Sequence, residues 1–142
     1  MRYIKSCGFV AYKQIENRNY YLIIKSLNGD VGFPKGHMET EESELETATR
    51  ELKEETGVEI NAVPGFRIQI EYPLTKIADT KKQSVYFLGR CILDNIVIQK
   101  SEVAEANFLS YEDALKILTF DDTKNILKKA EEYIRNGIYS SP

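Results

Sequence analysis

The sequence predicts an α/β (α+β) fold in which a mixed β-sheet lies between helices. Two β-rich regions are separated by a glutamate-rich, helix-like segment, and the C-terminal part of the chain is helix-like again. Strands, a helix, more strands and more helices in this order favour one sheet covered by helices on both sides. At 142 residues, the chain is predicted to form one domain, residues 1–142.

Two apolar runs open the chain. SCGFVAYKQ (6–14) and YYLIIKS (20–26) are β-rich, and the polar IENRN between them predicts a hairpin. Cys7 lies in the first run and Cys91 in a later one, and neither has a Cys or His nearby at metal-ligand spacing. We expect both cysteines to be reduced core residues.

The glutamate-rich segment, residues 36–58, is predicted to form the helix between the two sets of strands. Ser43 and Glu46 match a capping box and Gly57 supplies a stop, which together give a helix of about thirteen residues. One narrow face of this helix is apolar and should pack on the sheet. Its residues are Leu45, Ala48 and Leu52.

Three carboxylates of this helix, Glu51, Glu54 and Glu55, fall in one band beside the apolar face. Glu51 and Glu55 form a like-charge pair near the helix C-terminus, and neither has a Lys or Arg four residues on. A hard divalent cation such as Mg²⁺ would offset the repulsion, since it takes oxygen ligands. The alternative is a solvated acidic face, and the residues leave both interpretations open. Arg50 points about 100° away from the band and is predicted to orient a neighbouring Glu.

The loop ahead of the helix, VGFPKGHMETEE (31–42), contains the turn formers Pro34 and Gly36. It also carries a lone cation, Lys35, and the only histidine, His37. Backbone amides and these two side chains would hold phosphate oxygens while a metal ion holds others, which suggests polyphosphate chemistry. The alternative for both residues is an ordinary surface turn.

Further β-like runs follow the acidic helix. They are FRIQIEY (66–72), SVYFLGRCIL (84–93), NIVIQ (95–99) and NFLS (107–110). Ser110 with Asp113 predicts a capping box before the helical YEDALKIL. TKNILKKAEEYIRNG predicts the last helix, which ends at Gly137.

Composition excludes some partners. A net charge of -3 and a pI near 5.3 argue against general binding of nucleic acids or anionic membranes, which favour basic surfaces. The chain has no long apolar run and no charged-then-apolar leader, so we expect a cytoplasmic protein without membrane contact.

One set of spacings matches a known family pattern. Gly36, five residues, Glu42, seven residues and then the run RELKEETGV (50–58) resemble the Nudix box at every defined position. This resemblance implies the Nudix α/β/α sandwich and hydrolysis of a nucleoside diphosphate linked to another group. Water would attack phosphorus, and Mg²⁺, or alternatively Mn²⁺, would neutralise the developing charge.

The resemblance also implies roles by position. The implied metal ligands are Glu51, Glu54, Glu55 and the carbonyl of Gly36, and Arg50 would position a box glutamate. Glu42 would help to close the junction of loop and helix. The general base varies within the family, and here we expect Glu51 or Glu54 to take this part.

Outside the box, the chain resembles the asymmetric diadenosine tetraphosphate hydrolases. FPKGHME precedes the box, and GFRIQIEYPL, a Lys pair, VYFL and YEDA follow in that family's order. The resemblance implies a pocket where adenine stacks on aromatic rings and the phosphates meet Lys and His. The matching positions are Lys35, His37, Tyr72, Lys82 and Tyr86. Core packing is the alternative for either tyrosine, and more so for Tyr86.

The chain departs from this family in SEVAEANFLS (101–110). Glu102 aligns with a family Glu that would be a further metal ligand or base, but the flanking His and aromatic residues are replaced, and Glu105 competes for the role. Substrate preference is therefore open as well. The segment PLTKIADTKKQ (73–83) is interpreted as either a basic lid over the phosphates or an exposed hairpin loop.

Three hypotheses follow for function. The first is a Mg²⁺-dependent hydrolase that cleaves bis(5'-nucleosyl) tetraphosphate asymmetrically to ATP and AMP. The second is a Nudix pyrophosphohydrolase acting on RNA 5' ends, nucleoside triphosphates or other nucleoside diphosphate derivatives. The third is a non-catalytic nucleotide-sensing domain, which retention of all box carboxylates disfavours. We expect a small nucleotide as substrate, no nucleic-acid contact beyond RNA 5' ends, and a monomer or weak homodimer.

Overall fold

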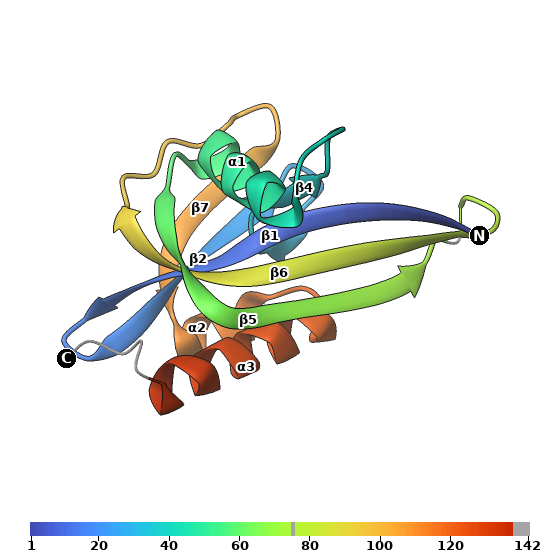
Figure 1. Ribbon diagram of the computed structural model, residues 1–142. Coiled ribbons are helices and arrows are strands. Elements are labelled where there is room, and N and C mark those ends of the chain that lie inside the picture. The colour runs from blue at the N-terminus through green and yellow to red at the C-terminus, as the bar shows by residue number, and fades with distance from the viewer. Residues whose placement is uncertain (75, 138–142) are drawn as a thin grey trace.

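The computed structural model describes residues 1–74 and 76–137, in which seven strands form one mixed sheet and three helices cover its faces (Figure 1). The strands are β1 (Arg2–Ile15), β2 (Arg18–Ser26), β3 (Val31–Gly32), β4 (Lys35–His37), β5 (Glu59–Pro73), β6 (Thr80–Leu93) and β7 (Val103–Ser110). The helices are α1 (Glu44–Thr56), α2 (Tyr111–Ile117) and α3 (Asp121–Asn136). The predicted fold class is confirmed.

Strand β1 is the centre of the sheet. The main order is β3-β2-β1-β6-β5, and β4 and β7 pair with β1 and β2, respectively. β1 runs parallel to β6 from Arg2 to Tyr12, whereas its other partners are antiparallel. Ser6 to Gly8 of β1 pair with β4, and Tyr12 to Ile15 at its end pair with β2. At Gly8 the approach of β4 is so close that a Cβ would overlap the Pro34 carbonyl oxygen and Lys35.

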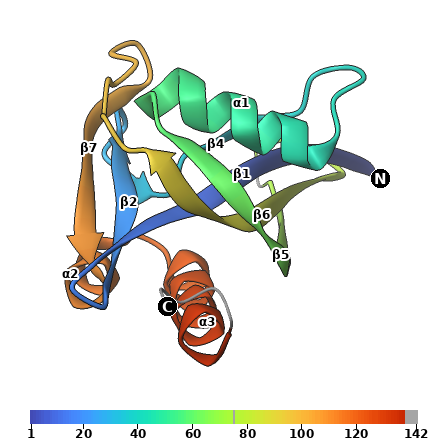
Figure 2. The same cartoon turned by 60° about the vertical axis from the view of Figure 1, so that its left-hand side comes forward.

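The sheet has a hydrophobic core on each face, because successive side chains of a strand point to opposite sides. Phe9 and Ala11 of β1 pack in the cluster that contains Leu52 of α1. Val10 and Tyr12 pack in the other cluster, together with side chains of α3. Figure 2 shows the resulting layers, with α1 on one side of the sheet and α2 and α3 on the other.

The predicted start and end of α1 are confirmed. Ser43 Oγ accepts a hydrogen bond from the Glu46 amide and the Glu46 side chain accepts one from the Ser43 amide, while Gly57 ends the helix with a φ of 74°. The predicted apolar face is wrong in one position, because Leu45 is 42% exposed. The buried face is shifted around the helix and includes Glu55, which is 8% exposed.

One of the two short strand predictions is wrong and the other is confirmed. NIVIQ (95–99) forms no strand, because its amides bond to the end of α1: Val97 N–H donates to the Thr56 carbonyl and Gln99 N–H to that of Glu55. NFLS is the end of the longer β7.

Cys7 and Cys91 are both free, the first buried and the second half-buried. No helix in the described part of the chain is long and apolar enough to cross a membrane.

Candidate active site

Strand register places the predicted phosphate-binding side chains on one face of the sheet. In β4, Lys35 lies opposite Gly8 and His37 opposite Ser6 of β1. Lys82 of β6 lies opposite Tyr72 of β5. Paired residues on neighbouring strands project to the same side. Residues far apart in the chain, from β4, β5 and β6, therefore line the same depression.

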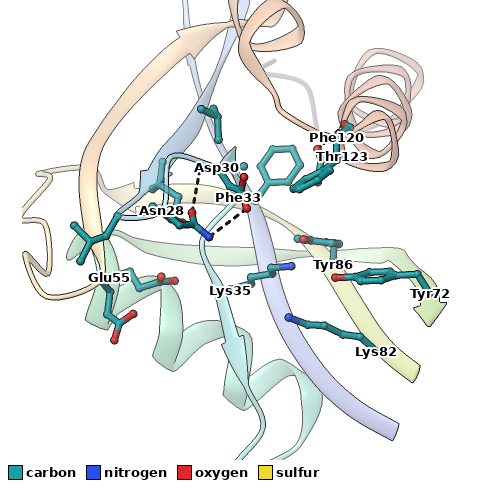
Figure 3. Close-up of a pocket in the computed structure, with 16 residues that line it drawn as sticks. Asn28, Asp30, Phe33, Lys35, Glu55, Tyr72, Lys82, Tyr86, Phe120 and Thr123 are labelled. Carbon is teal, nitrogen blue, oxygen red and sulfur yellow. Dashed lines mark hydrogen bonds between the residues drawn. The ribbon is translucent and has the colours of Figure 1, made fainter. Parts of the chain in front are cut away.

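Two adjoining cavities make up a cleft on this face. One has a volume of about 540 Å³ and contains the aromatic side chains, and the other has about 530 Å³ and contains the box glutamates. Four residues line both cavities, namely Lys35, Glu55, Lys82 and Glu102. Figure 3 shows Lys35 and Lys82 between Glu55 on one side and Tyr72 and Tyr86 on the other.

All of the predicted site residues except Arg50 line this cleft. Gly36, His37, Glu51 and Glu54 line the second cavity, whereas Tyr72 and Tyr86 line the first. Gly36 lies against the Glu51 carboxyl group, because a Cβ at this position would overlap it. Within residues 1–74 and 76–137, no three His, Cys, Asp or Glu side chains are grouped closely enough to hold a metal ion.

Arg50 forms hydrogen bonds to several carboxylates of the box. Its guanidinium donates to both oxygens of Glu42, at 2.6 and 3.0 Å, and to Glu51 at 2.8 Å and Glu54 at 3.3 Å. A further hydrogen bond of 3.1 Å reaches the His37 carbonyl. The side chain therefore folds back onto its own helix and onto the loop, so that one fork fixes Glu42, Glu51 and the loop together.

The acidic side of the cleft is electrostatically unbalanced. Burial and, to a lesser extent, the charge of Glu51 raise the pKa of the Glu55 carboxyl to about 8. Burial also raises the pKa of Glu51. Glu55 Oε1 is buried and has no hydrogen-bond partner in the described structure. A buried carboxylate oxygen without a partner, beside further carboxylates, fits a hard divalent cation, which prefers oxygen ligands.

The lysines of the cleft lack a compensating negative charge within ion-pair distance in the part of the chain that the structure describes. Burial and, to a lesser extent, the neighbouring charge of Lys82 lower the pKa of Lys35 to about 8. Burial also lowers the pKa of Lys82. No ion pair to a carboxylate is found for either lysine in the described residues. Two half-buried ammonium groups that face one cavity favour an anion between them.

The aromatic residues of the first cavity differ in exposure. Tyr86 is 1% exposed and packs edge-on against Phe33, so it belongs chiefly to the core. Tyr72 is half-buried, and Phe120 is 54% exposed. Tyr72 and Phe120 therefore offer the accessible rings of this cavity. Phe120 was missed in the sequence, where it is only one residue before the last helix.

The structure distinguishes between Glu102 and Glu105, the two candidate glutamates of residues 101–110. Glu102 lines both cavities, and its backbone is held by bonds to Gln99 and Leu27. Glu105 lines neither cavity and lies 3.9 Å from Lys25 Nζ. Of the segment 73–83, only Lys82 reaches the cleft, and Thr75 lies outside the described residues.

Comparison with known families matches residues 11–130 to the NUDIX domain. The chain belongs to the Nudix family. Nudix hydrolases generally use divalent metal ions, which agrees with the unbalanced carboxylates of the cleft. The prediction of a Nudix hydrolase is confirmed.

Similar Nudix proteins include asymmetrical bis(5'-nucleosyl)-tetraphosphatases. That of Mus musculus is 28% identical over 92% of this chain and 95% of its own length, and that of Sus scrofa is 25% identical with the same coverage. A binary complex of the C. elegans Ap4A hydrolase superimposes with a TM-score of 0.85 at 21% identity, covering 94% of this chain and 99% of that chain. The NUDIX domain of Shewanella oneidensis NrtR, complexed with ADP ribose, has a TM-score of 0.71 at 20% identity over 93% and 88%. These two structures show that the fold is shared.

Proposed function

We propose that this Nudix protein is a Mg²⁺-dependent hydrolase that cleaves bis(5'-nucleosyl) tetraphosphates asymmetrically, giving ATP and AMP from the diadenosine compound. The observation that carries the proposal is the order of side chains along the cleft: carboxylates, then two lysines, then accessible aromatic rings. A nucleotide with a long phosphate chain has the complementary order of metal-binding phosphate, further phosphates and base. The names of the similar mouse and pig proteins support this substrate class.

The proposed metal ligands are Glu51, Glu54, Glu55, the Gly36 carbonyl and Glu102. Glu55 supports this set most directly, because its buried Oε1 has no partner in the described residues. Glu51 and Glu54 would have to exchange part of their contact with Arg50 for the ion. When bound, the ion would neutralise charge that develops on the phosphate oxygens.

The remaining side chains would bind and orient the substrate. Lys35, Lys82 and His37 would form charge-assisted hydrogen bonds to the phosphates. Tyr72 would stack on one base, an interaction that contributes about 1–3 kcal/mol per base. Tyr86, which is buried, would support the position of Lys35, whose Nζ lies 6.0 Å from the centre of its ring. Phe120 is a second ring available for stacking.

Glu51 or Glu54 is the proposed general base, which would accept a proton from the attacking water. Burial raises the pKa of Glu51, so its carboxylate is a stronger base than an exposed one. Arg50 would act through these carboxylates by fixing their orientation, because it does not line the cleft itself.

We also propose that the chain is one domain that acts in the cytoplasm as a monomer or weak homodimer; residues 138–142 lie outside the described residues.

The test is hydrolysis of diadenosine tetraphosphate with Mg²⁺ in ¹⁸O-labelled water, with separation of AMP, ADP and ATP. We expect ATP plus AMP, with the label in only one of them, because water attacks a single phosphorus. Two molecules of ADP would contradict asymmetric cleavage. No turnover of the dinucleotide, with activity on triphosphorylated RNA or free nucleotides, would favour the alternative Nudix substrates. A control with chelator-treated enzyme assayed without Mg²⁺ tests the metal requirement.

A further inference from the structure

We propose that Asp30 selects the base of the substrate and favours guanine over adenine. This inference rests on the proposed function, because it assigns the base-binding end of the same cleft. Asp30 lines the aromatic cavity together with Phe33, Tyr72 and Phe120. Figure 3 shows Asp30 beside Phe33, at the end of the cavity away from Lys82.

The turn between β2 and β3 holds Asp30 firmly. The Ser26 amide donates to the Asp30 carbonyl at 2.8 Å, and the Asp30 amide donates to Asn28 Oδ1 at 3.0 Å. Asn28 Nδ2 in turn donates to Asp30 Oδ2 at 3.3 Å. This arrangement closes the turn through the Asn28 side chain. Hydrogen bonds of its amide and of its carbonyl therefore fix the backbone that carries the carboxylate.

Two reciprocal bonds join this turn to the start of α3. The Val31 amide donates to Thr119 Oγ1 at 2.7 Å, and the Thr119 amide donates to the Val31 carbonyl at 3.1 Å. Asp30 immediately precedes Val31 in the sequence, and Phe120 immediately follows Thr119. The carboxylate and the exposed aromatic ring are consequently held close to each other, so a base that stacks on Phe120 has its edge near Asp30.

Charge along the cleft also favours a neutral hydrogen-bond donor at Asp30. The phosphates would have the two lysines as partners, and the negative charge of Asp30 also acts on Lys35. Asp30 Oδ1 accepts no hydrogen bond from the described residues, and Oδ2 accepts only the long one from Asn28. A carboxylate accepts but cannot donate, so its partner must supply N–H groups.

Guanine supplies the better partner for this carboxylate. Its N1–H and N2 amine are adjacent donors that match the two carboxylate oxygens, whereas adenine presents its N6 amine beside the N1 acceptor. Two charge-assisted bonds would form with guanine, while adenine would form one and face repulsion at the second oxygen. Hypoxanthine has N1–H but no N2 amine and should bind with intermediate affinity.

The experiment measures dissociation constants of diguanosine and diadenosine tetraphosphate by calorimetry with Mg²⁺, in a Glu54→Gln background that slows hydrolysis. We expect the guanine compound to bind at least about tenfold more tightly. Asp30→Ala should bring the ratio close to one. Asp30→Asn should reverse it, because an amide can accept from N6 and donate to N1 of adenine. Asp94→Asn, a carboxylate outside both cavities, is the matched control and should keep the original ratio.

Equal constants with Asp30 present, or a ratio that Asp30→Asn and Asp30→Ala leave unaltered, would overturn the inference. Turnover of both dinucleotides by the unmodified enzyme is measured in parallel. If neither is hydrolysed, the proposed function fails, while the ratio of dissociation constants still decides the role of Asp30. If both are hydrolysed and the ratio is one, only the base selection fails.

Discussion

The two ends of α1 carry similar glutamates in opposite electrostatic states. At the beginning of the helix, hydrogen bonds from Arg67 and then Lys5 lower the pKa of Glu44 to about 2. Near its end, burial and neighbouring carboxylates raise the pKa of Glu55 to about 8. Glu44 has three hydrogen bonds from basic side chains, whereas Glu55 Oε1 has no partner in the described structure.

The difference shows that partners from outside the helix decide which glutamates are structural. Glu44 ties α1 to β1 through Lys5 and to β5 through Arg67. The carboxylates at the end of α1 instead face the cleft, where Lys35 and Lys82 form no ion pair with them in the described residues. Arg50 joins the loop ahead of the helix to the functional end, because it bonds to Glu42 as well as to Glu51 and Glu54. The comparison predicts that substitutions at the end of α1 near Glu55 lower activity, whereas substitutions at its beginning near Glu44 lower stability.

The largest effect is expected from Glu54→Gln at the functional end. Turnover should fall about a hundredfold or more, because the amide cannot replace a carboxylate as metal ligand or base. The melting temperature should stay nearly the same, since the Glu54 side chain is 48% exposed. Turnover and thermal unfolding are measured together, with Glu59→Gln, outside both cavities, as control. Unchanged turnover in Glu54→Gln would remove this residue from the site.

Arg50→Lys tests the residue that joins the loop ahead of the helix to the functional end. Lysine keeps the charge but loses the fork that bonds to Glu42, Glu51 and Glu54. We expect a loss of about 10–100-fold in turnover or in apparent metal affinity, as for other residues that orient metal ligands. The measurement is turnover as a function of Mg²⁺ concentration at several pH values. If Arg50 only stabilised the fold, the variant would have lower turnover but the same Mg²⁺ and pH dependence. Arg18→Lys, a surface pair with Glu112, is the control.

Much of the fold could be predicted from the sequence because its signals are local. The hairpin of β1 and β2, the capping box at Ser43 and the stop at Gly57 each depend on residues a few positions apart. NIVIQ (95–99) was misread because its apolar composition resembles a strand, whereas its amides bond to carbonyls of α1. Such long-range partners leave no local pattern.

The same distinction applies to the cleft. The box glutamates lie on one helix, and their convergence follows from helical spacing. Asp30 and Phe120 lie 90 positions apart and meet only through the bonds between Val31 and Thr119. The choice of Glu102 over Glu105 likewise depends on how β7 and its preceding loop approach β2. Sequence spacing contains none of this information.

At the structural end of α1, Glu44→Gln should lower stability in a pH-dependent way. A carboxyl whose folded-state pKa is near 2, compared with 4.5 for an ordinary glutamate, contributes stability fully above about pH 4.5 and loses it as the pH falls towards 2. Solvent screens this partly exposed group, so we expect a difference of about 1–2 kcal/mol at neutral pH. Urea unfolding from neutral to acid pH should show the difference between variant and unmodified protein shrinking. A difference that is constant with pH would mean that ionisation of Glu44 is not its cause.

The smallest effect is expected from Ser43→Ala, at the first residue of the same end. Ser43 Oγ accepts the Glu46 amide at 3.1 Å, and the substitution removes this bond while the reciprocal bond of 2.9 Å from the Ser43 amide to Glu46 Oε1 is retained. Loss of such a cap costs about 1 kcal/mol of unfolding free energy. Urea unfolding measures this cost, and Thr49→Ala, an exposed hydroxyl bonded to the Leu45 carbonyl, is the control. Turnover should be nearly unchanged, because Ala48 and Leu52 still fix the rest of the helix on the sheet. A large loss of turnover with a small loss of stability would mean that the two ends of α1 are coupled, and the division between them would have to be abandoned.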